Sequence, residues 1–234
     1  MHSTYTMVMS SVIGCLLTVP TQAQNGSTEP EFIRYDFTIS VRENLFGSSV
    51  NSLAGLQVGQ LGSFSIAVLN DRDLFGSQST ETDQVYSIQD IAIQIGSINS
   101  GGDPAHVPSV GFLDTFLLSN NGRASSHPQA AVSDSMGSIL YFDNPDLGFS
   151  VFSISQVTTF DVEPTLFSSL DLPREPFDLS LITSQNHLVI QDPADGFQRV
   201  NFVFTNVEIT VIPTPATGVL AILSGICARN RRRR

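Results

Sequence analysis

Apolar and polar residues alternate along most of the chain between residues 31 and 211. In the segment Phe32–Val41, every second residue from Ile33 onward is apolar, and most of the residues between them are polar. A period of two is typical of a β-strand with one buried face and one solvated face. The same pattern predicts strands at Ser63–Leu69, Val85–Ile95, Val110–Leu118, Ile139–Phe142, Leu147–Ile154, Phe177–Ile182, Leu188–Ile190 and Arg199–Val211.

Two of these predicted strands change phase part-way along. The first has Tyr86 and Ile88 on one face and then continues with Ile91, one position out of step. The last has the same shift between Phe204 and Val207. A slip of one residue within an otherwise regular alternation indicates a β-bulge.

Helix signals are scarce in the same region. The best candidate is the segment Glu163–Leu170, with Pro164 near its first position. Many short strands separated by Gly, Pro, Asn and Asp favour an antiparallel β-sandwich, jelly-roll-like, and no fixed-period repeat suggests a propeller or a solenoid. Residues 31–211 are enough for one sizeable core, so we expect a single β-sandwich ectodomain.

The first 23 residues have the features of a secretory signal peptide. An apolar stretch runs from about Met7 to Val19, Pro20 ends it, and small residues up to Ala23 offer a cleavage site. Residues 24–30 then form a flexible leader. Two alternatives remain: translation can start at Met7, and the residues before Cys15 resemble a lipoprotein box, although little apolar sequence precedes that cysteine.

The C-terminal segment, residues 212–234, has three parts in order. Pro213 and Pro215 interrupt regular structure, residues 216–228 are apolar and uncharged, and the chain ends in an arginine block, Arg229 and Arg231, Arg232, Arg233, Arg234. The apolar run is shorter than the roughly 20 residues that span a bilayer comfortably, but it can span with its flanks or with local thinning. Terminal arginines favour the cytoplasmic side, so the segment reads as a stop-transfer element.

This arrangement resembles the PEP-CTERM sorting signal of exported bacterial proteins, in which a Pro-Glu-Pro step precedes a short apolar helix and a basic end. The chain has Thr214 where the family has glutamate. The resemblance implies a membrane protease partner of the exosortase type and an envelope or extracellular-matrix setting in a cell that makes exopolysaccharide. The alternative is a plain tail anchor or an unstructured basic end.

The first half of the chain also resembles a common ectodomain pattern of PEP-CTERM proteins. An aromatic strand at Tyr35–Val41 is followed by a Ser-rich strand at Val58–Ile66, an Asp-containing turn at Asn70–Asp73 and a strand that begins at Tyr86. What this resemblance implies is a β-sandwich with no established activity.

The positions of the cysteines and the excess of acidic residues restrict the structural and functional classes further. Both cysteines, Cys15 and Cys227, lie in the segments predicted to be removed, so the domain must fold without disulfides. All eleven basic residues are arginine; without the five in the tail, six basic residues remain against 22 acidic ones, a formal charge of −16. That excess repels nucleic acid, and we predict no nucleic-acid role.

Acidic turns are the candidate metal ligands. Asp71 with Asp73, Asp143 with Asp146, and Asp192 with Asp195 each lie in a predicted loop, and calcium takes oxygen ligands from such loops. None of these pairs has the spacing of an EF-hand, and Asp is also a good turn former. The sequence therefore predicts no cofactor beyond a possible structural calcium ion, with surface turns as the alternative.

No catalytic constellation stands out. His106 and His127 lie beside prolines in predicted loops and His187 at a strand entrance, outside any nucleophile-elbow or metalloprotease motif. Two close carboxylate pairs, Asp161 with Glu163 and Asp171 with Glu175, could suggest a glycosidase, but sequence spacing says nothing of the gap that this mechanism needs. The chain also has no tryptophan, the residue most often used to stack sugars.

Three functional hypotheses follow. We predict a structural or interaction protein of the envelope or matrix, without catalytic activity. A carbohydrate-binding module, with exopolysaccharide as its ligand, is the alternative, and it would need a ridge of exposed aromatic residues. A secreted hydrolase is the third, and it would need a cleft in which histidine and carboxylate groups converge.

Overall fold

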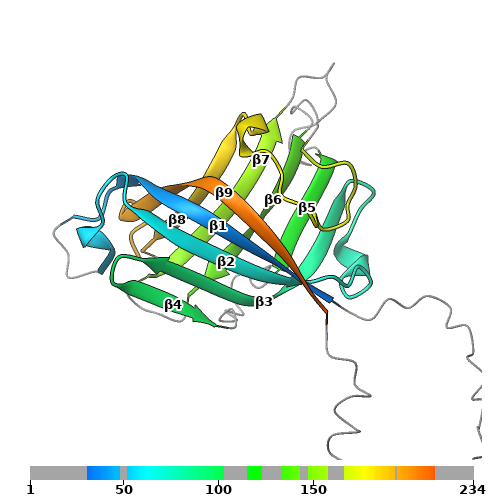
Figure 1. Ribbon diagram of the computed structural model, residues 1–234, viewed down its shortest axis with the longest axis horizontal. Helices are drawn as coiled ribbons and strands as arrows, with labels where there is room; N and C mark the ends of the chain where they lie inside the picture. Colours follow the sequence, from blue (N-terminus) through cyan, green and yellow to red (C-terminus); the bar gives the residue numbers. More distant parts are fainter. Residues whose placement is uncertain are drawn as a thin grey trace, which may run out of the picture.

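Nine antiparallel strands and three short 3-10 helices make up the described part of the chain (Figure 1). The computed structural model describes residues 31–47, 52–102, 115–122, 133–142, 147–157, 166–192 and 194–213. The strands are β1 (Glu31–Asn44), β2 (Leu61–Leu69), β3 (Asp83–Ile95), β4 (Ile98–Gly102), β5 (Thr115–Gly122), β6 (Ser133–Tyr141), β7 (Phe149–Val157), β8 (Gln185–Gln191) and β9 (Arg199–Pro213). The 3-10 helices are η1 (Ser52–Gly55), η2 (Gly76–Gln78) and η3 (Leu179–Leu181).

Eight of the strands close into an antiparallel barrel, so the predicted β-sandwich is wrong while the all-β class is confirmed. Strand β1 pairs with β2 on one edge and with β9 on the other, and β2 pairs in turn with β3. The ring continues through β5, β6, β7 and β8 back to β9, and β4 extends from β3 beyond the end of β5. Alternation is identical in a sandwich and in a barrel, because both bury one face of each strand.

Aromatic side chains fill the barrel interior. Tyr35, Phe37, Phe64, Phe116 and Phe152 are all buried, and so is Phe204, whose ring centroid lies 4.6 Å from that of Phe37. An eight-stranded barrel is just wide enough for side chains to fill it, and rings at these distances also attract one another. The core therefore stabilises the fold without any disulfide between the described residues.

Both predicted bulges are confirmed. Ala67 lies opposite Asp90 and Val68 opposite Ile88, which leaves Gln89 as the extra residue of β3. In the same way, Thr38 and Ile39 lie opposite Asn206 and Phe204, which leaves Thr205 unpaired in β9. Each bulge lets the strand keep its apolar residues on the inner face after the phase shift.

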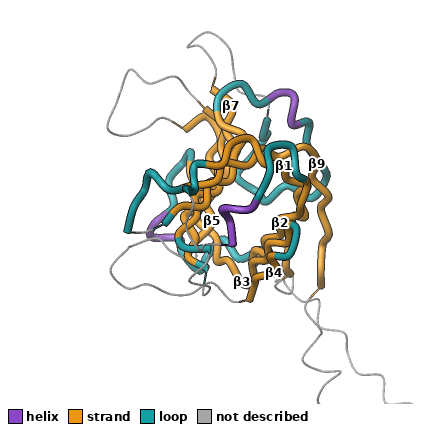
Figure 2. The backbone as a smooth tube through the Cα atoms, turned by 90° about the vertical axis from the view of Figure 1, so that its left-hand side faces the viewer, coloured by secondary structure: helices purple, strands orange, loops and turns teal. Residues whose placement is uncertain are grey.

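The two ends of the barrel are covered by loops. At one end, the side-chain amide of Asn44 donates to the carbonyl oxygens of Leu53 and Leu56 (2.9 Å each), and η1 inserts the buried Leu53 beneath the strand ends. Figure 2 views the molecule from this side, with the strands arranged around the interior. At the other end, β1 begins and β9 stops, with Glu31 directly opposite Pro213.

Two sequence predictions fail in the loops. The described part of the predicted helix, residues 166–170, is an irregular loop, and residues 163–165 lie outside the described chain. Phe177–Ile182 is a loop that contains η3, with no strand. The predicted short strand Ile139–Phe142 is a strand, but it is the end of the longer β6, which stops at Tyr141. Of the predicted strand Val110–Leu118, residues 110–114 lie outside the described chain. No helix among the described residues is long and apolar enough to cross a membrane.

Candidate functional site

A loop between β7 and β8, residues Leu166–Phe177, covers the barrel end at which β1 begins; we call it the strap. Its two prolines, Pro173 and Pro176, lack the N–H groups that a strand or helix would need, which explains its irregular path. The strap inserts Leu166, Phe167 and Leu172 into the core, and all three are buried. A segment without regular hydrogen bonds is thus anchored by its apolar side chains.

Two tyrosines inside the barrel also anchor the strap. The Tyr35 hydroxyl donates to the carbonyl oxygen of Pro173 at 3.1 Å, and the Tyr86 hydroxyl donates to that of Leu170. Burial raises the pKa of Tyr86 to about 12 and raises the pKa of Tyr35 as well, since both phenolate forms would lose hydration. Both hydroxyls therefore remain protonated donors at neutral pH.

A buried carboxylate forms a third anchor. Asp134 of β6 is fully buried, and one of its oxygens accepts the backbone N–H of Asn121 at 2.9 Å. Asn121 lies at an irregularity of β5 and has a φ of 57°, so its N–H points away from the regular ladder. The other Asp134 oxygen accepts the N–H of Phe167 at 3.0 Å, so one side chain joins β5, β6 and the strap.

Two ion pairs hold the strap at its rim. Arg174 donates to the carboxylate of Glu31, the first residue of β1, and Arg72 donates to Asp171 at 3.0 Å. Three of these four side chains are about half exposed or more, so each pair contributes little stability. Their effect on the site is to cancel two positive and two negative charges locally.

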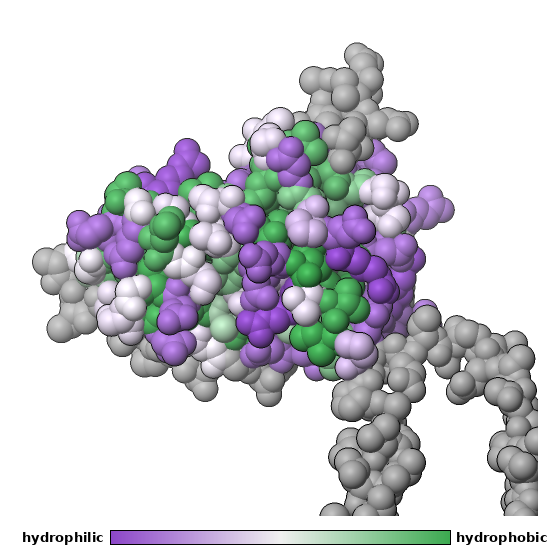
Figure 3. All heavy atoms as spheres, viewed as in Figure 1, coloured by the Kyte–Doolittle hydropathy of each residue, from purple (hydrophilic) through white to green (hydrophobic). Residues whose placement is uncertain are grey.

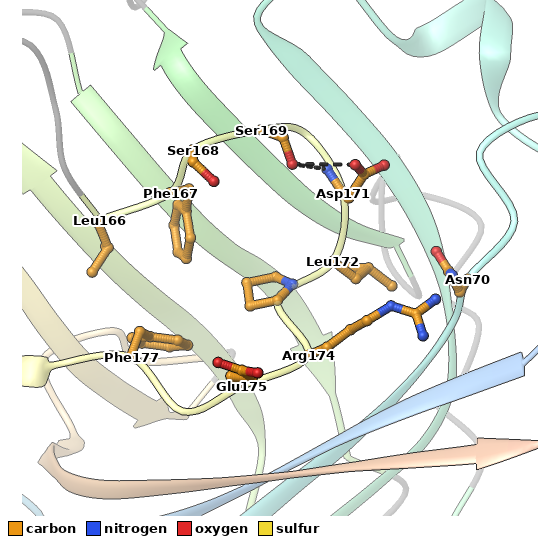
Figure 4. A pocket seen from close by; sticks show the side chains of 11 residues that line it. Asn70, Leu166, Phe167, Ser168, Ser169, Asp171, Leu172, Arg174, Glu175 and Phe177 are labelled. Carbon is orange, nitrogen blue, oxygen red and sulfur yellow. Dashed lines mark hydrogen bonds between the residues drawn. The ribbon is translucent and has the colours of Figure 1, made fainter.

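The strap lines an open candidate pocket (Figure 4), which has a volume of ≈ 660 Å³. The Phe167 and Phe177 rings meet edge to face, with centroids 5.6 Å apart, where the strap's two arms come together. Polar groups line the rest of the pocket: Asn70, Ser168, Ser169, Asp171, Arg174 and Glu175. Compact surface loops whose ends approach each other are frequently functional, and this volume suits a small ligand.

Two of the polar groups are not engaged within the described chain. Asp171 and Ser169 bond to each other, and Asp171 also pairs with Arg72. Ser168 and Glu175, both exposed, make no hydrogen bond or ion pair to any described residue. They are therefore the groups with which a ligand can bond at no cost to existing contacts.

A second depression, of ≈ 720 Å³, runs over the outer face of β5, β6, β7 and β8. Its floor combines aliphatic residues such as Leu117 and Ile139 with serines such as Ser135 and Ser153. His187 lies here, within β8, and is half-buried. Burial, and to a smaller extent the positive charge of Arg42, lowers the pKa of His187. Among the described residues of the lining, Asp83 is the one carboxylate; it is already bonded to Ser119 and Thr80, and three strands lie between it and His187.

Three of the predicted calcium candidates, Asp71, Asp192 and Asp195, serve as turn caps in this structure. Asp71 accepts the N–H groups of Asp73 and Leu74, at 3.0 and 3.3 Å. Asp192 accepts the N–H of Ala194 at 2.8 Å and Asp195 that of Phe197 at 3.1 Å. No group of three or more potential metal-ligating side chains occurs among the described residues, and Asp143 and Asp146 lie outside them.

Several other predicted residues also lie outside the described chain: Ala23, Thr214, Pro215, the arginines of the tail, His106, His127, Asp161 and Glu163. Of the sorting-signal residues, Pro213 is described, as the last residue of β9. Among the large apolar side chains exposed in the described region, Phe197 is the one aromatic, and it lies in the turn before β9.

The sequence paired Asp171 with Glu175 as carboxylates, and the structure places both in the pocket lining with different roles. Sequence reasoning missed Ser168 and Phe177 as site residues. The Pro-Arg-Glu-Pro run at residues 173–176 is the signal that could have indicated an irregular, anchored loop here.

Comparisons of the chain with protein-family models, curated proteins and solved structures gave no match.

Proposed function

We propose that the chain is an exported bacterial protein of the cell surface or extracellular matrix, sorted at the membrane by its PEP-CTERM-like tail. The barrel serves as an interaction domain, and the partner that processes the tail is a membrane protease of the exosortase type. The sorting role of the tail is inferred from the order of its parts in residues 212–234: a proline step, an apolar run and an arginine block.

The pairing of Glu31 with Pro213 is the structural observation that supports this proposal most directly. The first and last strands of the barrel are neighbours, so the leader and the tail leave the domain at the same end. A signal peptide and a sorting tail can therefore be attached at one end of this barrel, and cleavage after Pro213 would leave every strand pairing among the described residues intact.

The barrel interior favours an interaction role over a catalytic one. Its space is occupied by packed aromatic rings, and the polar groups that are open to a ligand lie in the strap pocket and on the outer surface. Figure 3 shows a mixture of hydrophilic and hydrophobic residues on the face of the molecule that it presents.

Cell fractionation tests the proposal. The parent chain is compared with a variant in which Arg231, Arg232, Arg233 and Arg234 are replaced by serine, and with a control in which they are replaced by lysine. We expect the parent and the lysine control to pause in the membrane and to be shortened at the C-terminus, because both retain positive charge on the cytoplasmic side. The serine variant should pass through uncut or be degraded. If it pauses and is processed like the parent, the arginine block is not a sorting signal.

A further inference from the structure

The strap pocket contains hydrogen-bond acceptors that the described chain leaves unengaged. The Glu175 carboxylate is unengaged within the described chain, and the Asn70 side chain donates to Glu31 through its nitrogen, which leaves its oxygen as an acceptor. Arg174 donates to Glu31 through two of its nitrogens, so its charge is already paired. A ligand with N–H donors can bond to Glu175 and to the Asn70 oxygen.

The local charge points the same way. Arg174 with Glu31 and Arg72 with Asp171 form neutral pairs around the pocket, so Glu175 remains as the uncompensated charge of its lining. The domain as a whole is strongly acidic once the tail arginines are set aside. A negative field of this kind attracts cations and disfavours anionic ligands.

Aromatic rings complete the pocket. Phe177 is only partly buried and lies on the same arm of the strap as Glu175, while Phe167 packs against it edge to face (Figure 4). The face of a phenyl ring attracts a cation through its quadrupole, and that attraction adds to the pull of a nearby carboxylate. The anchors at Tyr35, Tyr86 and Asp134 hold this arrangement in place, so little order has to be gained on binding.

We propose that the strap pocket binds an organic cation, an alkylammonium or guanidinium group, with Glu175 as its counter-ion and Phe177 as its aromatic wall. The inference goes beyond the proposed sorting function, because it does not depend on the tail. The same chemistry can come from a free polyamine or from a basic side chain of a polypeptide, and the probes below separate the two sources.

The test is a ligand-observed NMR titration of the full-length chain in a polyoxyethylene detergent. The probes are spermidine, N-acetyl-arginine N-methylamide and the citrulline analogue of the latter, which has the same shape without the charge. We expect the arginine probe to bind at least about fivefold more tightly than the citrulline probe, and this ratio to shrink in 0.5 M salt because exposed charges are screened. Spermidine binding would indicate a polyamine, and arginine binding alone a basic polypeptide.

Variants place the binding in the pocket. Glu175→Gln should weaken arginine binding about threefold to fivefold without affecting citrulline, and Phe177→Leu about twofold to fivefold, since it keeps apolar volume and removes the ring. Glu81→Gln is the matched control: it removes the same charge from an exposed residue of the loop before β3, outside the pocket.

Three results would overturn the proposal. The first is that neither spermidine nor the arginine probe binds more tightly than the citrulline probe. The second is an equal loss in the Glu175 and Glu81 variants, which would show a general charge effect. The third is that an uncharged hexasaccharide binds more tightly than either cation and that Phe177→Leu weakens the binding of this sugar. The pocket would then be a sugar site. Failure of the sorting experiment, by contrast, leaves all of these readouts unchanged.

Discussion

Replacing Asp134 with alanine should release the strap and destabilise the barrel. The carboxylate is fully buried and accepts two backbone N–H groups, from Asn121 and from Phe167. Leaving a buried donor unsatisfied costs about 1–3 kcal/mol, which applies in full to the buried Phe167 N–H. Asn121 is exposed, so the cost for the two donors together stays below the limit of about 6 kcal/mol that two buried donors would set. Part of this is offset because a buried charge no longer has to be desolvated. We therefore expect a loss of about 3 kcal/mol.

Thermal unfolding followed by circular dichroism measures this loss. For a domain of this size, about 3 kcal/mol corresponds to a decrease in Tm of roughly 6–12 °C. Asp90→Ala is the control, because Asp90 is an exposed carboxylate of β3 and should change stability by no more than about 0.5 kcal/mol. Limited trypsin digestion gives a local readout: cleavage after Arg174 in the strap should become faster in the Asp134 variant. If that variant melts within about 2 °C of the parent and resists trypsin equally, Asp134 does not anchor the strap.

Three further predictions follow from the described contacts. The free energy of unfolding should fall between about pH 10 and pH 12, because burial raises the pKa of Tyr86, so that the unfolded chain ionises in this range while the folded form does not. In unfolding titrations Tyr86→Phe should reduce that loss, and an unchanged pH profile would contradict the assignment. Phe37→Ala should cost about 3–5 kcal/mol, measured by urea unfolding, since the ring contacts those of Phe64, Phe152 and Phe204; a loss below about 1 kcal/mol would mean that the interior is loosely packed. Residues 24–212 should melt at the same temperature with and without reductant, because Cys15 and Cys227 lie outside them, and a large loss in reductant would refute this.

Most strands could be predicted because their physical signal is local. Burial of one face imposes a period of two, and even the bulges at Gln89 and Thr205 are visible as phase shifts in the sequence. Strand β4 escaped prediction because its sequence, Ile-Asn-Ser-Gly-Gly, has no alternation. The first half of β6 escaped because one of its buried positions carries Asp134 in place of an apolar residue.

Barrel closure could not be predicted because it is a non-local property. It depends on which strands meet β1 on its two edges, and the alternation within each strand is compatible with several answers. The predicted strand at Phe177–Ile182 failed for a related reason: Phe177 and Leu179 pack against the core from a loop, without a partner strand, while Leu181 is exposed. The pocket combines the strap with Asn70, about a hundred residues earlier, so that juxtaposition too is visible only in three dimensions.

The neighbouring positions of β1 and β9 also set the order of events during synthesis. The barrel wall cannot be completed until residue 213 has left the ribosome, because β9 supplies the second partner of β1. Until then, β1 and β8 each present an unpaired edge, the kind of surface on which chains aggregate. Pairing between strands far apart in the sequence is slow, so these two edges stay open for as long as the chain needs to bring β1 and β9 together.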